Sequence, residues 1–132
     1  MKLNNYTEYA FRVLMYLMMH KSEKTRVQEI ADFFELSANH LNKIVQQLAK
    51  HELVITTRGK NGGVEISAQG EEISLDQLIV ILEPREEVAQ CMGSKSIMPC
   101  RLAGDCKLRG IFGGAREAFF EHLRKYKIKD LI

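Results

Sequence analysis

The first fifty residues carry apolar side chains at the three- and four-residue spacing of amphipathic helices. Three stretches show this pattern: residues 6–20, 25–34 and 38–50. Asn5 with Glu8, and Thr25 with Gln28, have the spacing of capping boxes, which predicts the N-termini of the first two helices at these positions. Ser37 belongs to a residue type that commonly caps helices, so the third helix is predicted to begin directly after it.

After residue 52 the pattern changes to that of extended chain. Residues 53–57 and 64–66 are rich in β-forming side chains, and the Asn61-Gly62 pair between them is typical of a hairpin turn. Two helices joined by a tight turn at residues 35–37, followed by a hairpin with a basic tip, have the element order of a winged helix-turn-helix. The predicted fold class is therefore mainly α with a small β-hairpin.

The second half of the chain is predicted to hold two further helices separated by a polar loop. Ser74 and Gln77 have capping-box spacing for a fourth helix, which Pro84 would end. A long final helix is predicted over residues 106–126. The predicted units are a winged helix-turn-helix DNA-binding domain, residues 1–84, and a cysteine-bearing loop with the final helix, residues 85–132.

The third helix buries its apolar stripe and would present polar side chains on its other face. Asparagine and glutamine can bridge adenine edges in the major groove, while lysine reaches guanine or phosphate. At the hairpin tip, basic side chains can meet phosphates or the minor groove, and glycine lets the backbone approach DNA closely. The candidate DNA-binding residues are Gln28, Ser37, Asn39, His40, Lys43, Arg58, Gly59, Lys60, Asn61 and Gly62. The alternative interpretation is a solvated helix beside an ordinary hairpin.

The distribution of charge is more informative than its total. The chain of 132 residues has a formal net charge of +2, but residues 37–63 hold four basic side chains against one acid, Glu52, as expected of a nucleic-acid-binding face. No apolar run approaches the ~20 residues that span a bilayer, and the first residues lack the apolar stretch of a signal peptide. We therefore expect a cytoplasmic protein with no membrane partner, whose thiols stay reduced.

Cys91, Cys100 and Cys106 are the only cysteines of the chain. An odd set cannot pair completely as disulfides within one chain, so the group indicates a metal or redox site. The tight Cys-x-x-Cys of structural zinc sites is missing, and three loop thiols better suit an iron–sulfur cluster of two or four irons. The fourth ligand would be a carboxylate, a histidine, a small molecule or a group from another subunit. The alternative is a loop with three unliganded thiols.

Several motifs together resemble the Rrf-two-type transcriptional regulators, and in particular their NsrR branch. The motifs are the wing Arg58-Gly59-x-x-Gly62-Gly63, the stretch from Pro99 to Leu108, the opening residues 1–9, Asn39-His40-Leu41 and the closing residues 126–132. The resemblance covers essentially the whole chain. It implies a homodimeric repressor that dimerises through its last helix and binds double-stranded DNA at a palindromic operator. It also implies an iron–sulfur cluster that nitric oxide attacks, releasing the DNA.

The resemblance maps the three cysteines onto cluster ligands and implies that an acidic residue near the start of the first helix completes the site from the partner subunit. Glu8 holds that position, where aspartate, one methylene shorter, is expected. Two other roles are open for Glu8: capping acid for Asn5, or ion-pair partner of Arg12 four residues on.

Other functions compete with a nitric-oxide-sensitive repressor. Within the same family, the alternative is a regulator that senses iron or iron–sulfur status. From other classes, a redox enzyme or electron carrier and a cluster-free interaction protein are possible. The sequence contains no nucleotide-binding loop and no catalytic constellation, so we do not expect an enzyme.

Overall fold

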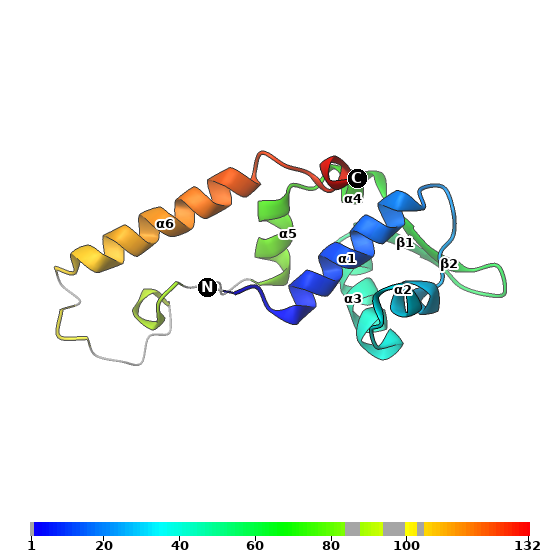
Figure 1. Ribbon diagram of the computed structural model, residues 1–132, viewed down its shortest axis with the longest axis horizontal. Coiled ribbons are helices and arrows are strands. Elements are labelled where there is room, and N and C mark those ends of the chain that lie inside the picture. The colour runs from blue at the N-terminus through cyan, green and yellow to red at the C-terminus, as the bar shows by residue number, and fades with distance from the viewer. Residues whose placement is uncertain (1, 84–87, 94–99, 103–104) are drawn as a thin grey trace.

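The computed structural model describes residues 2–83, 88–93, 100–102 and 105–132. Their elements are α1 Asn5–Met19, α2 Val27–Phe34, α3 Ala38–Lys50, β1 Val54–Thr57, β2 Gly63–Ile66, α4 Ala68–Glu72, α5 Leu75–Leu82, the 3-10 helix η1 Gln90–Met92, α6 Lys107–Leu123 and the 3-10 helix η2 Ile128–Leu131. This order confirms the predicted fold class, mainly α with a small antiparallel hairpin (Figure 1). Among the described helices, none is long and apolar enough to cross a membrane.

The hydrophobic core lies where α1 packs against α3, η2 and β2. We call the elements packed around it, α1–α5, the hairpin and η2, the body. The apolar stripes of the helices supply it: Leu14 and Leu17 of α1 and Leu41, Ile44 and Leu48 of α3 are all buried. Burying each such side chain stabilises the fold by about 1.5–3 kcal/mol. Helix α3 is therefore anchored firmly by the face opposite its polar residues.

The first two helices do not begin with their predicted capping boxes. Asn4 caps α1, one residue earlier than predicted, and its Oδ1 accepts a hydrogen bond from Thr7 N at 2.9 Å. Arg26 precedes α2 without a side-chain capping bond. Thr25 instead pairs its backbone with Val64 of β2, with N–O distances of 3.0 and 2.8 Å. Both predictions are wrong; at Thr25, pairing with a distant strand replaces local capping.

The turn between α2 and α3 contains a residue in an unfavourable conformation. Glu35 follows α2 with φ 54° and ψ 44°, in the left-handed region, which costs a non-glycine residue roughly 1–2 kcal/mol. Leu36 N then donates to Ala31 O at 2.9 Å, a closure typical of helix C-termini. Ser37 is the N-cap of α3, which confirms the predicted start of this helix.

The predicted hairpin is present. β1 and β2 pair in antiparallel register from Val54 opposite Ile66 to Thr57 opposite Gly63. Residues 58–62 form the loop between them, which we call the wing tip. The hairpin extends from the body at the end opposite to α6 (Figure 1).

The short helix α4 was not predicted. Ser67 caps it, because its Oγ accepts a hydrogen bond from Gly70 N at 2.9 Å. Gly70 lies against the backbone of Leu53, and a Cβ on Gly70 would lie 2.0 Å from the Leu53 carbonyl oxygen. This close packing, rather than an apolar stripe, places α4 on the hairpin base.

Residues after α6 return to the body and join its core. Ile128 is fully buried, and its N–H donates to Ile73 O at 3.2 Å. Lys127 and Lys129, which we call the lysine pair, both bind the carboxylate of Glu72 on α4, Lys127 at 2.7 Å. Hydrogen bonds from the lysine pair lower the pKa of Glu72 to about 2. These contacts tie the C-terminal segment to α4.

Helix α5 starts at Leu75 without the predicted capping box. Ser74 is the N-cap residue of this helix, which confirms the predicted start. Its side chain makes no capping bond, because its hydroxyl donates to the Asp76 carboxylate instead, so the reciprocal bonds predicted for Ser74 and Gln77 are not formed. Pro84, predicted to end this helix, lies outside the described residues.

Helix α6 projects away from the body (Figure 1). Phe120 is its one buried residue, and the helix ends at Leu123, before the predicted end at residue 126. Just beyond the helix, Arg124 Nε lies 3.0 Å from Asp76 Oδ2. Burial by itself would raise the pKa of Asp76, but hydrogen bonds from Ser74 and Arg124 hold it below its ordinary value of 3.8. This ion pair joins the end of α6 to α5.

Candidate DNA-binding face and cysteine loop

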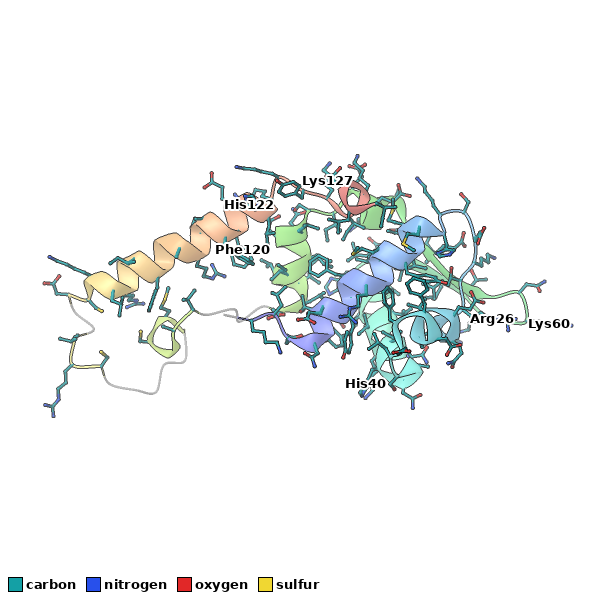
Figure 2. All side chains as sticks on the ribbon, in the orientation of Figure 1. Arg26, His40, Lys60, Phe120, His122 and Lys127 are labelled. Atoms are coloured by element: carbon teal, nitrogen blue, oxygen red, sulfur yellow. The ribbon has the colours of Figure 1, made fainter. Side chains whose placement is uncertain are left out.

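The polar face of α3 is exposed, as predicted. Ser37, Asn39, His40 and Lys43 are all open to solvent around the first two turns, the part of a recognition helix that reaches base edges. Figure 2 shows His40 at the outer edge of α3, pointing away from the body. The N-terminal half of α3 is therefore free to enter a major groove.

The first helix supports the recognition helix from behind. The hydroxyl of Tyr6 donates to the backbone carbonyl of Lys43 at 3.3 Å. Burial raises the pKa of the Tyr6 phenol, so this group stays protonated and keeps its donor. Tyr6, Tyr9, His40 and Lys43 line a groove of about 290 Å³ between the two helices.

Two glutamines of this region are already engaged within the chain. Gln28, the candidate on α2, is exposed, and its Nε2 donates to Asp32 Oδ1 at 2.7 Å. On α3, the Nε2 atom of Gln47 lies 3.2 Å from Nε2 of His51. One N–H of the Gln28 amide is used by Asp32, which leaves the other N–H as a donor for a phosphate.

The wing tip places the predicted candidates at the surface. Arg58, Gly59, Lys60 and Asn61 are all exposed. Gly59 has φ 102°, a conformation that favours glycine. At Gly62 a Cβ would lie 2.2 Å from a wing carbonyl oxygen, so only glycine fits there.

A groove of about 410 Å³ lies between α3 and the wing. Asn42 and Gln46 line it from α3, and Arg58 lines it from the wing. Arg26, which is not among the predicted DNA-binding residues, lines it as well, and its Nη2 donates to Lys60 O at 3.4 Å. No sequence pattern indicates this role, because it depends on the wing folding back over the start of α2.

The three cysteines are free thiols. Cys91 lies in η1 and is exposed, Cys100 is exposed, and Cys106 is the half-buried N-cap of α6. Within the described ranges, no three His, Cys, Asp or Glu side chains lie close enough together to hold a metal ion. In the described part of a single chain, the three thiols are therefore not grouped into a metal-binding site.

Glu8 occupies the first turn of α1 and is half-buried. The two alternative roles are not found. Asn4, not Asn5, caps the helix, and the guanidinium of Arg12 lies over the rings of Tyr9 and Phe34, at 5.6 and 5.8 Å from their centroids. Among the described residues, no hydrogen bond or ion pair engages the Glu8 carboxylate.

The donor chemistry fits a cluster of soft metal ions, even though the thiols are apart. Thiolates are the ligands that iron–sulfur clusters prefer, and none of the three is consumed by a disulfide. Of the described residues beside them, Arg101, Asp105 and Lys107 are exposed. Three thiols and one carboxylate from another helix would make four donors.

Comparison with other proteins agrees with this architecture. The HTH-type transcriptional regulator NsrR of Oceanobacillus iheyensis is 37% identical over 133 residues, covering 100% of this chain and 90% of that protein. NsrR of Bacillus subtilis is 30% identical, with the same coverage. The structure of IscR from T. potens shares the fold with a TM-score of 0.76 at 19% identity, covering 99% of this chain and 85% of that one. The structure of oxidized CymR from Staphylococcus aureus has a TM-score of 0.75 at 23% identity, covering 99% of this chain and 95% of that one.

A family model described as Rrf2, iron-dependent transcriptional regulator, matches residues 3–132. The match includes the recognition helix, the wing, the cysteine loop and α6. Together with full-length relatives above 30% identity, it shows that this chain belongs to the Rrf2 family of transcriptional regulators.

Proposed function

We propose that the chain is a homodimeric, cytoplasmic repressor that binds a palindromic operator and loses DNA when nitric oxide reacts at an iron–sulfur site. The observation that carries the DNA-binding half is the exposed polar face of α3 beside the basic wing tip, with Arg26, Asn42, Gln46 and Arg58 lining the groove between them. The full-length relatives named NsrR support the sensory half.

In this proposal α3 enters the major groove. Asn39, His40 and Lys43 meet base edges or nearby phosphates, since they lie exposed on the first two turns. Arg58 and Lys60 meet the flanking backbone, where glycines let the wing tip approach closely. The α1–α3 core holds these two elements at a fixed spacing.

The second copy would pack on α6. Leu108, Ile111, Ala115 and Ala118 are all exposed and recur at alternating three- and four-residue spacing, the seam of a coiled coil. Two recognition helices on one face of DNA must lie about one helical turn, ~34 Å, apart, so the angle between paired helices sets whether both half-sites are filled.

The residues that would hold the cluster are Cys91, Cys100 and Cys106, with Glu8 of the partner subunit as the candidate fourth ligand. When bound, such a cluster supplies irons that react with nitric oxide. Carboxylate is a harder donor than thiolate and binds iron of a cluster less tightly, so the Glu8 position would be the first to open. Cys106 caps α6, so a ligand held there orients the dimer helix directly.

A regulator of iron or iron–sulfur status is the second candidate. The observation that favours it is the description of the family model, which names iron dependence rather than nitric oxide. Both candidates use the same thiols, and they differ in which agent releases DNA.

The test begins with an operator. Duplexes selected by the purified protein from a random library are expected to converge on a palindrome. Reconstitution with iron and sulfide without oxygen should give a brown protein whose iron and sulfide are measured per dimer. Nitric oxide should bleach it and weaken binding to the selected duplex, while a chelator at equal exposure should act more slowly.

Two variants provide controls. Cys106→Ala should fail to bind the cluster yet retain the circular dichroism of the wild type, because Cys106 is not in the core. Glu8→Asp should keep the colour, and Glu8→Ala should bleach faster. A colourless wild type after careful reconstitution would refute the sensor, and release by chelator alone would favour iron status.

A further inference from the structure

The segment before α2 is joined to the base of the wing by backbone pairing. Thr25 exchanges two hydrogen bonds with Val64, at 3.0 and 2.8 Å, and is itself buried. A Cβ on Gly63 would lie 2.9 Å from the Thr25 carbonyl oxygen, so the close approach depends on glycine. The residue that follows Thr25 is therefore held at a fixed position beside the hairpin.

That residue is Arg26, and its side chain reaches along the wing. Its Nη2 donates to the carbonyl of Lys60 at 3.4 Å, across 34 positions of sequence. Figure 2 shows Arg26 and Lys60 together at the wing end of the molecule. A guanidinium has five N–H donors, so one bond to a carbonyl leaves most of its donors unused.

The charge of Arg26 is not neutralised within the described part of the chain. No ion pair to a carboxylate involves it there, and no acidic residue lines the groove it shares with Asn42, Gln46 and Arg58. The groove thus has an arginine on the α2 side and another on the wing side, with amide side chains of α3 between them. A planar guanidinium suits the oxygens of a phosphodiester.

We infer that Arg26 binds a backbone phosphate of the DNA and at the same time positions the wing tip. This inference rests on the proposed DNA binding and adds a contact outside the recognition helix and the wing. The guanidinium lies between the Lys60 carbonyl and the phosphate that crosses the groove. Since phosphates are the same at every base pair, Arg26 adds affinity without sequence preference.

The experiment measures binding to the duplex selected by the wild type over a series of salt concentrations. Arg26→Ala is expected to weaken binding at least about tenfold at 0.1 M salt. The slope of log affinity against log salt should become shallower by about 0.9 for each phosphate that the variant no longer neutralises. Ethylation of one phosphate per half-site should interfere with the wild type and not with the variant. Lys125→Ala, an equal change in charge near the C-terminus, should leave the slope unchanged.

Two further variants separate charge from positioning. Arg26→Lys should restore the salt slope, because it keeps the charge. Arg26→Gln should reduce the slope as Arg26→Ala does, but its amide can still donate to Lys60 O. Amide exchange at Gly62, which donates to Gly59 O at 3.0 Å in the wing tip, should therefore be faster only in Arg26→Ala.

The outcomes are distinct from those that test the proposed function. If the wild type selects no duplex, DNA binding itself fails. If the wild type binds and Arg26→Ala keeps the full salt slope, the phosphate contact is refuted. A changed ratio of selected to scrambled DNA would mean that Arg26 reads bases, which also overturns the assignment. Unchanged Gly62 exchange in Arg26→Ala would refute the positioning role.

Discussion

Gly70 provides the sharpest test of how the body is packed. Substituting alanine adds one methyl group, which in an ordinary helix raises stability by up to ~1 kcal/mol relative to glycine. In α4 the added Cβ would lie 2.0 Å from the carbonyl oxygen of Leu53, where ordinary contact begins at 3.4 Å. To reach the 3.0–3.4 Å of tight but observed contacts, the backbone of α4 or of Leu53 would have to move by about 1.0–1.4 Å.

That displacement affects bonds on both sides of the contact. Leu53 is fully buried and its carbonyl accepts from Ser67 N at 3.1 Å, while Ser67 Oγ accepts from Gly70 N at 2.9 Å. Overpacking typically costs about 1–3 kcal/mol, and each weakened hydrogen bond about 1 kcal/mol. After the gain in helix propensity, Gly70→Ala should destabilise the protein by about 2–4 kcal/mol.

Urea unfolding followed by circular dichroism at fixed protein concentration measures this difference. The matched control is Gly110→Ala in α6, where a Cβ meets nothing within 4 Å among the described residues, so the same substitution should stabilise by up to ~1 kcal/mol. If glycine-to-alanine substitution lowers the free energy of unfolding at Gly70 and raises it at Gly110, the difference comes from the packing around Gly70. Gly70→Ala within ~0.5 kcal/mol of the wild type, with an unchanged denaturant slope, would refute this packing of α4.

Three further predictions concern charge and backbone conformation. Asp76→Asn should destabilise the protein by roughly 2 kcal/mol at pH 7 in urea unfolding, since it removes the charge-assisted bond to Arg124. Because the pKa of Asp76 is lowered in the folded protein, the difference in stability between wild type and variant should be full above pH 3.8 and decrease below it. The lysine pair lowers the pKa of Glu72 to about 2, so thermal unfolding of wild type and Glu72→Gln should differ above pH 4.5 and converge as the pH falls to about 2. Glu35→Gly, which relieves a left-handed φ of 54°, should raise stability by about 0.5–1 kcal/mol, and a loss of stability would contradict the geometry.

Periodicity sufficed for α1, α3 and the hairpin because each of them has one face in the core. The stripe of Leu41, Ile44 and Leu48 is regular enough to orient α3 and thereby to expose its polar face, including Asn39 and His40. Capping patterns failed at the starts of α1 and α2. A capping pattern describes only local bonds, and at Thr25 the backbone bonds of a distant strand replace them.

Part of the candidate site depended on long-range geometry. Arg26 takes part in the groove between α3 and the wing only because Lys60 of the wing tip, 34 positions away in sequence, lies beside it. The sequence identified the three cysteines as candidate ligands from their residue type. Within the described residues of one chain, however, no three candidate ligands lie close together, so the cysteines and Glu8 remain predicted ligands. In the proposed dimer, the fourth donor would come from the partner subunit, so the contacts within one chain do not include it.

The distribution of packing explains how the cysteine loop could control the DNA-binding face without unfolding it. Attachments of α6 to the body include the buried side chain of Phe120 and the Arg124–Asp76 ion pair, each worth about 1.5–3 kcal/mol. The α1–α3 core, with at least five buried side chains, is worth several times more. Switching an orientation from 1% to 99% occupancy takes about 5.5 kcal/mol, close to the sum of those two attachments and well below the energy of the core. A ligand held at Cys106, the N-cap of α6, would therefore redirect this helix before it disturbed the recognition helix. In the proposed dimer, the spacing of the two α3 helices would change while each DNA-binding face stayed intact.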